Sequence, residues 1–383
     1  MRFGDLFEIC LLKKKLPAVV CRVLVFMYKE QSGFIFLRGR RSPAFSLTNG
    51  MREGAACSPV LWAVYADGLL LILRESGLGC KVAGLWVGGV LYADDLALLA
   101  PTRAILASML ALVESYGASL NLTFSSCQDP SKCKSFCVYF VGPKPSRKVV
   151  YPAPLELNGV RLPWKESAVH LGHTLHQDLT FKADAGVRRA AFIASSVEVR
   201  NEFAFAAPAQ VLKAVRVLCC SAYGAVLWRL SSFEASSFFK AYSSCVKRIW
   251  QLPLNTYTYL VEGHLSDGVP PLRNMVLSRY STFYQNMLRS PCSEVTVLAE
   301  LISKDARSTT AGNLAHVSAI TGLNCSTAGK IEIKAALPIT QVPDDQKWRL
   351  GLLDSLLRER STLLSEGQDA KCVISMISSL CNT

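Results

Sequence analysis

The chain has 383 residues, a formal net charge of +13 at pH 7 and a composition that is 50% hydrophobic. Its length allows two or three domains, and its basic excess agrees with a nucleic-acid partner, although general solubility also explains such a charge. The 14 cysteines form no Cys-x-x-Cys pair and lack nearby histidines, which argues against a zinc site and a disulfide framework. The apolar runs are too short to span a bilayer, and no signal peptide is evident. We therefore expect an intracellular protein of the nucleus or cytoplasm, neither secreted nor membrane-bound.

The first candidate binding residues are three arginines, Arg38, Arg40 and Arg41, which follow an expected hairpin at residues 32–33. Such a cluster is typical of a surface that contacts phosphates, and solubility is the alternative reading. The next segment has two glycines that let the backbone approach a ligand closely, and its candidate residues are Gly50, Arg52, Glu53 and Gly54.

A helix is predicted to begin directly after this glycine-bearing loop. The Ser58 hydroxyl is expected to cap it, and Pro59 suits the first helical position. The apolar residues that follow recur at helical spacing toward Gly77, so the helix should face a core.

Two adjacent carboxylates, Asp94 and Asp95, stand in the sequence Tyr92-Ala93-Asp94-Asp95 between apolar runs at 87–91 and 96–100. Both runs predict short buried strands, so the aspartates should lie at the bend of a hairpin. Their charges repel unless a cation lies between them, and Mg²⁺ is often held by one or two carboxylates plus substrate phosphates. The alternative is a solvated hairpin tip that happens to be acidic.

Further elements follow the hairpin. Thr102 is expected to cap a helix that ends at Gly117, and a basic segment then contains Lys132. The pattern from residue 180 onward becomes helical and amphipathic.

The order of glycine-bearing loop, Ser-Pro helix and Tyr-Ala-Asp-Asp hairpin resembles the palm of a reverse transcriptase, in particular that of non-LTR (LINE-like) retrotransposons. The resemblance implies an RNA template, a DNA primer, dNTP substrates and Mg²⁺ or Mn²⁺. By it, Asp94 would ligate the metal directly, Asp95 would support it, and Tyr92 would pack near the primer end.

The same resemblance assigns roles outside the hairpin. Lys132 would lie near the incoming triphosphate, where its charge helps pyrophosphate to leave. Leu171 and Gly172 match a Tyr-Leu-Gly-x-x-Leu hairpin that holds the primer end, and the three early arginines would contact the template.

The chain departs from the family in one respect that bears on activity. A two-metal site needs carboxylates on both sides of the ion pair, and the family supplies one aspartate from an earlier strand. That strand is expected just before Met1, so we expect an N-terminally truncated, inactive enzyme that holds metal only if the site is completed. Asp5 falls after the required position, and Glu53 stands where the family usually has glutamine.

We therefore predict an α+β fold, in which a partial polymerase palm of antiparallel sheet with helices precedes a helical thumb and a helical C-terminal region. The expected divisions are a palm lacking its first catalytic strand and most of the fingers, a palm-to-thumb hairpin region, a thumb-like region and a C-terminal region: 1–145, 146–178, 179–265 and 266–383. A polymerase-derived remnant that binds nucleic acid without catalysis is the alternative function, and an unrelated helical protein is a third reading.

Overall fold

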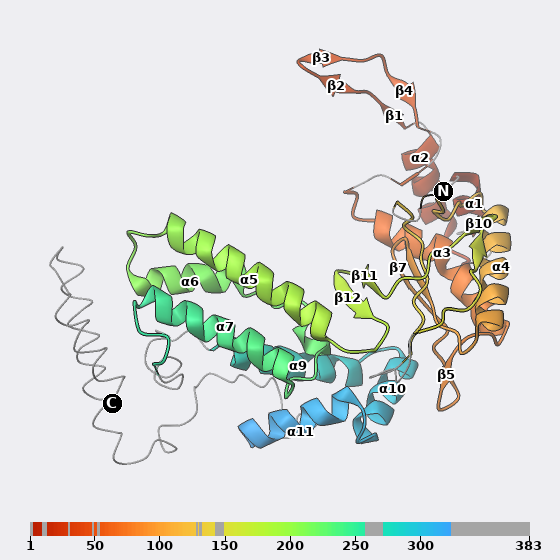
Figure 1. Ribbon diagram of the computed structural model, residues 1–383. Helices are drawn as coiled ribbons and strands as arrows, with labels where there is room; N and C mark the ends of the chain where they lie inside the picture. The colour runs from red at the N-terminus through yellow and green to blue at the C-terminus, as the bar shows by residue number, and fades with distance from the viewer. Residues whose placement is uncertain are drawn as a thin grey trace. The chain divides into compact units, whose positions relative to one another are not determined.

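The computed structural model describes residues 3–9, 14–29, 31–47, 50–51, 54–127, 129, 132–141, 149–256 and 271–322. Its fold is mixed α+β, with helices and small antiparallel sheets (Figure 1), which agrees with the predicted class at this coarse level. Two compact units are present: residues 1–139 with 145–166, and residues 140–144 with 167–383. The predicted division into palm, hairpin region and thumb remains a prediction.

The described residues of the first unit form four helices and five two-stranded antiparallel sheets. The helices are α1 (Phe3–Glu8), α2 (Ala18–Lys29), α3 (Ser58–Glu75) and α4 (Arg103–Ser119). The strands are β1 (Ser32–Gly33), β2 (Phe36–Leu37), β3 (Arg40–Arg41), β4 (Phe45–Ser46), β5 (Lys81–Val82), β6 (Leu85–Trp86), β7 (Gly89–Tyr92), β8 (Asp95–Leu98), β9 (Glu156–Leu157) and β10 (Val160–Arg161). They pair as β1–β4, β2–β3, β5–β6, β7–β8 and β9–β10, so each sheet among the described residues has two strands.

The core of the first unit lies mainly between its helices. Leu69 and Leu73 of α3 pack with Met109 and Val113 of α4, and all four side chains are buried. A separate cluster joins α1 and α2 to the N-terminal half of α3 around Tyr65, whose hydroxyl donates to the carbonyl oxygen of Leu120 at 2.9 Å. These contacts make α3 the central element of this unit.

Helix α4 begins as predicted and ends later than predicted. The Thr102 hydroxyl accepts the amide of Ile105 at 3.3 Å, which caps the first turn. Gly117 was expected to end the helix, but α4 continues to Ser119. The glycine serves a close contact instead, because a Cβ there would lie 2.9 Å from the Leu122 carbonyl oxygen.

The second unit is mainly helical where it is described. Its elements are β11 (Ser167–His170), β12 (His173–His176), α5 (Lys182–Glu202), α6 (Pro208–Cys219), the 3₁₀ helix η2 (Ala225–Leu227), α7 (Phe233–Ile249), α9 (Leu272–Leu288), α10 (Ser293–Lys304) and α11 (Thr309–Thr321). The largest apolar cluster of the described residues joins these helices. At its centre Trp228 packs edge-on against Phe238, with ring centroids 5.3 Å apart, and Phe192 contacts the same ring at 6.0 Å.

Among the residues that the structure describes, no helix combines the length and the apolar character that crossing a membrane requires. Residues 323–383, and with them most of the predicted C-terminal region, lie outside the described ranges.

Candidate functional site

The candidate site lies at the turn between β7 and β8. Tyr92 pairs with Asp95 and Leu91 with Leu96, which leaves Ala93 and Asp94 as a two-residue turn. Ala93 has φ +50°, a left-handed conformation of the kind that the favoured hairpin turns require. The predicted strand-turn-strand is therefore present, with Asp94 in the turn and Asp95 as the first residue of β8.

The two strands are less buried than the sequence predicted. Val90 and Tyr92 are 51% and 65% exposed, whereas Leu96 and Leu98 are half-buried against the α3–α4 core. The physical reason is that the described part of the sheet has only two strands, so one face packs on the helices and the other faces solvent.

A hydrogen bond to the backbone of the turn holds it against α3, while the two carboxylates of the turn are exposed. The indole Nε1 of Trp62 in α3 donates to the carbonyl oxygen of Ala93 at 2.5 Å, and Trp62 itself stacks on Tyr65. Asp94 and Asp95 are exposed, and within the described ranges no hydrogen bond or ion pair engages either carboxylate. Trp62 went unnoticed in the sequence, where it resembles any apolar residue of the helix.

Two carboxylates can supply part of a magnesium site. Their oxygens are the ligands that hard cations prefer, and their exposure leaves room for water or phosphate ligands. Among the described residues, no group of three or more His, Cys, Asp and Glu side chains lies together in a way that could hold a metal. Asp5 lies in α1, where a carboxylate oxygen is 3.4 Å from the hydroxyl oxygen of Tyr65.

Lys132 has a different neighbour from the one that the resemblance implies. Its Nζ lies 3.7 Å from a carboxylate oxygen of Asp129, and the side chain is 79% exposed. No described contact joins Lys132 to Asp94 or Asp95. The triphosphate role therefore stays a prediction, and it requires this exposed ion pair to open.

The loop before α3 is described only in part. Gly50 has φ +104° and Gly54 has φ +76°, so both occupy backbone conformations that favour glycine. Arg52 and Glu53 lie outside the described residues.

The start of α3 differs from the prediction by one residue. The helix begins at Ser58, and Cys57 takes the N-cap position with helical φ and ψ and without a side-chain hydrogen bond. Pro59 is thus the second helical residue, and the expected cap by the Ser58 hydroxyl is wrong. The preceding turn explains the shift, because the Ser58 amide already donates to the Ala55 carbonyl oxygen at 3.1 Å.

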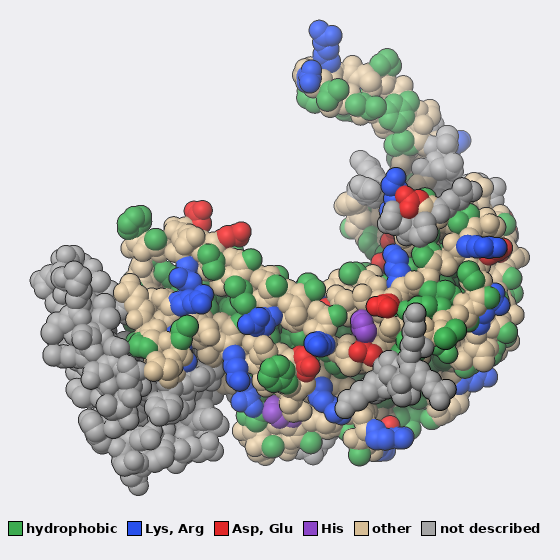
Figure 2. Space-filling view, viewed as in Figure 1, with side chains coloured by type: hydrophobic (Ala, Val, Ile, Leu, Met, Phe, Trp, Pro, Cys, Tyr) green, Lys and Arg blue, Asp and Glu red, His purple; other side chains and the backbone are tan. Residues whose placement is uncertain are grey.

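The arginine cluster occupies a hairpin arm formed by β1 to β4. The expected hairpin exists, but Ser32 and Gly33 form its base strand β1, and its turn lies at Arg38 and Gly39, both with positive φ. Figure 2 displays hydrophobic side chains along the arm and basic ones at its tip. The Arg41 guanidinium lies 3.6 Å from the ring centroid of Phe34, which leaves Arg38 and Arg40 as the exposed charges without such a contact.

Leu171 and Gly172 form the turn of the β11–β12 hairpin in the second unit. His170 pairs with His173 across this turn, and the two turn residues have φ +47° and +77°. Arg188 of α5 donates to the Gly172 carbonyl oxygen, and the Tyr223 hydroxyl donates to that of Leu171 at 3.4 Å. Both turn carbonyls are therefore held by their own unit.

A buried carboxylate behind this hairpin was also missed in the sequence. Asp184 of α5 accepts the Thr174 amide at 3.0 Å and the Trp228 indole at 2.8 Å. Its side chain is 5% exposed and also lies 3.9 Å from a ring nitrogen of His173. No local sequence pattern predicts this network, because its members come from three separate elements.

Comparison with known proteins gave no match: neither a protein-family model nor a curated protein is significantly similar to the chain.

Proposed function

We propose that this chain is part of an RNA-directed DNA polymerase, the reverse transcriptase of a non-LTR retrotransposon, in which Asp94 and Asp95 hold a divalent cation. The observation that supports it most is the exposed carboxylate pair on a turn whose backbone is fixed by Trp62. This geometry leaves the oxygens available and limits the movement of the residues that carry them. The order of the motifs along the sequence adds to this support.

In the proposed reaction, the 3′ hydroxyl of a DNA primer attacks the α-phosphorus of a dNTP paired with an RNA template, and pyrophosphate leaves. Mg²⁺ or Mn²⁺ would stabilise the charge on the attacking and leaving oxygens. Asp94 would supply a direct ligand, Asp95 would support it, and Tyr92 would pack near the primer end. A further carboxylate is required, and it would come from outside the described residues.

Metal binding provides the first test. We join a segment that carries the further carboxylate to the chain, titrate Mn²⁺ into this extended protein and follow binding by electron paramagnetic resonance. We expect Mn²⁺ to bind at least about tenfold more weakly after Asp94→Asn, because a charged oxygen ligand is lost. Glu75→Gln is the matched control, since it removes one exposed charge from the same unit. Equal Mn²⁺ affinity in the two variants would overturn the metal site.

Polymerisation provides the second test. For the protein extended by a segment that carries a further aspartate, we expect template-dependent dNTP incorporation that Asp94→Asn abolishes. Incorporation at an equal rate by the Asp94→Asn protein would show that the assignment is wrong.

A second candidate function is nucleic-acid binding without catalysis. It is favoured by the exposed Arg38 and Arg40 at the tip of the arm (Figure 2). The exposed rings of Phe34 and Phe36 beside these charges suit the stacking of unpaired bases.

A salt titration of single-stranded RNA affinity tests this candidate. Neutralising one side chain that binds a phosphate of a single strand should reduce the slope of log K against log salt by about 0.7. We expect that reduction from Arg38→Gln and from Arg40→Gln, and none from Lys81→Gln, which removes an exposed charge elsewhere in the unit. If the slope of log K against log salt were the same in Arg38→Gln, Arg40→Gln, Lys81→Gln and the wild type, the arm would be excluded as the surface that binds RNA.

A further inference from the structure

A basic groove lies between α5 and α7 of the second unit, with a volume of about 270 Å³. Each helix contributes one face, with lining residues three or four positions apart, so the groove follows both helices. Its polar lining includes Arg189 and Arg200 from α5, and Ser237, Lys240, Ser244 and Arg248 from α7. No acidic side chain is among the described residues that line it.

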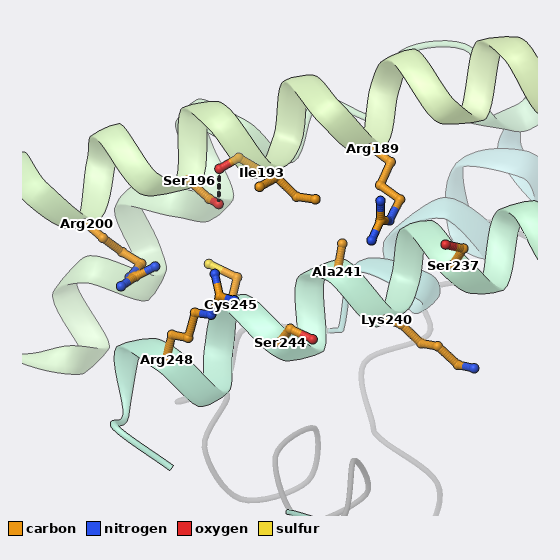
Figure 3. Close-up of a pocket in the computed structure, with 10 residues that line it drawn as sticks. All are labelled: Arg189, Ile193, Ser196, Arg200, Ser237, Lys240, Ala241, Ser244, Cys245 and Arg248. Carbon is orange, nitrogen blue, oxygen red and sulfur yellow. Dashed lines mark hydrogen bonds between the residues drawn. The ribbon is translucent and has the colours of Figure 1, made fainter. Parts of the chain in front are cut away.

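The guanidinium groups of the groove occupy two positions. Figure 3 shows Arg200 of α5 and Arg248 of α7 near Cys245 toward one end of the groove, and Arg189 toward the other end, near Ala241 and Ser237. The side chain of Lys240 extends away from the groove in this view. Arg189 and Arg200 are three helical turns apart, so their Cα atoms are separated by about 16 Å along the axis of α5. The long side chains of Arg189 and Arg248 extend into the groove between these ends, so their guanidinium groups approach one recess from two positions (Figure 3).

These arginines differ from others in the same unit. Arg188 donates to the Gly172 carbonyl oxygen, and Arg279 donates to that of Ser221. By contrast, within the described residues no carboxylate or carbonyl oxygen pairs with Arg189, Arg200 or Arg248. Five N–H donors on each guanidinium therefore remain for an acceptor from outside.

The floor of the groove adds no negative charge. Cys245 is buried, and burial raises the pKa of its thiol, so the sulfur stays neutral at pH 7. The Ser196 hydroxyl donates to the Ile193 carbonyl oxygen at 2.9 Å, while the half-buried hydroxyls of Ser237 and Ser244 line the groove. The groove thus combines planar cations with hydroxyl donors, which suits phosphate oxygens.

We propose that this groove binds a compact anion that carries two or more phosphate groups. Two phosphates are the minimum, because the guanidinium groups form two separate positions. A compact ligand is favoured, because the hydroxyls lie in a recess near the lower size of small-molecule sites, about 300 Å³. This inference goes beyond the proposed function and does not depend on Asp94 or Asp95.

Calorimetric titration of the full chain with inorganic tripolyphosphate, at constant ionic strength, tests the proposal. We expect saturable binding that weakens about tenfold or more after Arg248→Met, because a charge-assisted hydrogen bond is lost. Arg248 is exposed, so its replacement should leave folding intact. The matched control is Arg229→Met, which removes an exposed arginine outside the groove and should leave the affinity unchanged.

A second variant distinguishes binding in the groove from a general attraction of the anion to the protein's positive charge. Ser244→Leu fills the recess without changing any charge, and we expect it to weaken tripolyphosphate binding as well. Equal affinity in the wild type, Arg248→Met and Ser244→Leu would overturn the proposal. The proposal would also be wrong if tripolyphosphate did not bind while a short RNA bound in an Arg248-dependent manner, because the groove would then hold a nucleic-acid backbone.

Discussion

Two hairpins of the same size, one in each unit, use their turns in opposite ways. Both β7–β8 and β11–β12 pair four residues with four, and both place a non-glycine residue in the left-handed region, Ala93 at φ +50° and Leu171 at +47°. In the second hairpin Gly172 follows at φ +77°, which gives two consecutive positive φ values as in a type I′ turn.

The difference lies in what surrounds the polar groups. At the first turn Trp62 holds one carbonyl, and the carboxylates of Asp94 and Asp95 are exposed. At the second turn both carbonyls are held, and the nearby carboxylate, Asp184, is buried between protein donors. An exposed carboxylate can bind a cation without loss of internal contacts, whereas a buried carboxylate is already used to join β12, α5 and Trp228. The same residue type is therefore exposed at the turn of one unit and part of a buried hydrogen-bond network in the other.

The largest expected effect on the free energy of unfolding comes from removing the buried carboxylate of Asp184, and removing the exposed carboxylate of Asp94 is the comparison. Asp184→Ala should lower the free energy of unfolding by about 3 kcal/mol, because the Trp228 indole and the Thr174 amide lose their acceptor in a buried site. Asp94→Ala should change it by less than about 0.5 kcal/mol, as is usual for exposed positions. Urea denaturation followed by tryptophan fluorescence measures both, and similar losses from the two variants would contradict the comparison.

A second prediction concerns the close approach of Gly224 to the β11–β12 hairpin. A Cβ on Gly224 would lie 1.6 Å from Cε1 of His173, and the residue has φ +78°. Gly224→Ala should therefore destabilise the chain by about 2 kcal/mol, combining backbone strain with displacement of a ring that stacks on Tyr223.

The His173→Ala background separates the two causes. There the clash is absent, so the added cost of Gly224→Ala should fall to about 1 kcal/mol, the cost of the left-handed backbone alone. An unchanged cost in that background would mean that the ring does not limit the position.

Local signals in the sequence predicted the elements whose ends they control. Thr102 caps α4, and Asp94 stands in a hairpin turn, because each depends on neighbours within a few residues. Helix α3 begins at Ser58, one residue earlier than predicted, because the backbone at Cys57 already has helical φ and ψ.

Contacts between distant segments could not be predicted in this way. The Tyr65 hydroxyl donates to the Leu120 carbonyl oxygen, 55 positions along the chain, and the Trp228 indole donates to Asp184, 44 positions away. The support that Trp62 gives to the Ala93 carbonyl also joins residues 31 positions apart. For the candidate site, the sequence therefore predicted the carboxylates and not the residue that fixes their turn.

A third, smaller effect tests the strain in the first turn. Ala93→Gly should stabilise the β7–β8 hairpin by about 0.5 kcal/mol, because glycine adopts positive φ without the steric cost that alanine has there. Ala97→Gly, in β8, is the matched control and should destabilise the hairpin by about 0.5–1 kcal/mol. Amide hydrogen exchange across residues 89–98 measures both, and slower exchange in Ala97→Gly than in Ala93→Gly would contradict the turn geometry.

The smallest effect concerns the acid response of the second hairpin, which Asp178 follows directly. Burial alone would raise the pKa of Asp178, but hydrogen bonds from the amide and hydroxyl of Thr180, and from His176 at 2.6 Å, together lower it below its usual value. A lowered pKa in the folded state means that the folded chain binds fewer protons than the unfolded chain. The resulting stabilisation is present above the unfolded pKa of Asp178, and it is lost as pH falls through the folded pKa.

Asp178→Asn should therefore reduce the loss of stability between neutral and strongly acidic pH, measured as the urea midpoint at successive pH values. Thr180→Val removes the hydroxyl bond and keeps the amide bond, so its acid response should lie between those of the wild type and Asp178→Asn. If Asp178→Asn had the same acid response as the wild type, the hydrogen bonds at this turn would not favour the ionised carboxylate. The contacts that hold the β11–β12 hairpin would then be those of Asp184, Arg188 and Tyr223. The contrast with the exposed Asp94 turn would in that case depend on the packing of α5 and of the segment before η2, and not on the residues that follow the hairpin.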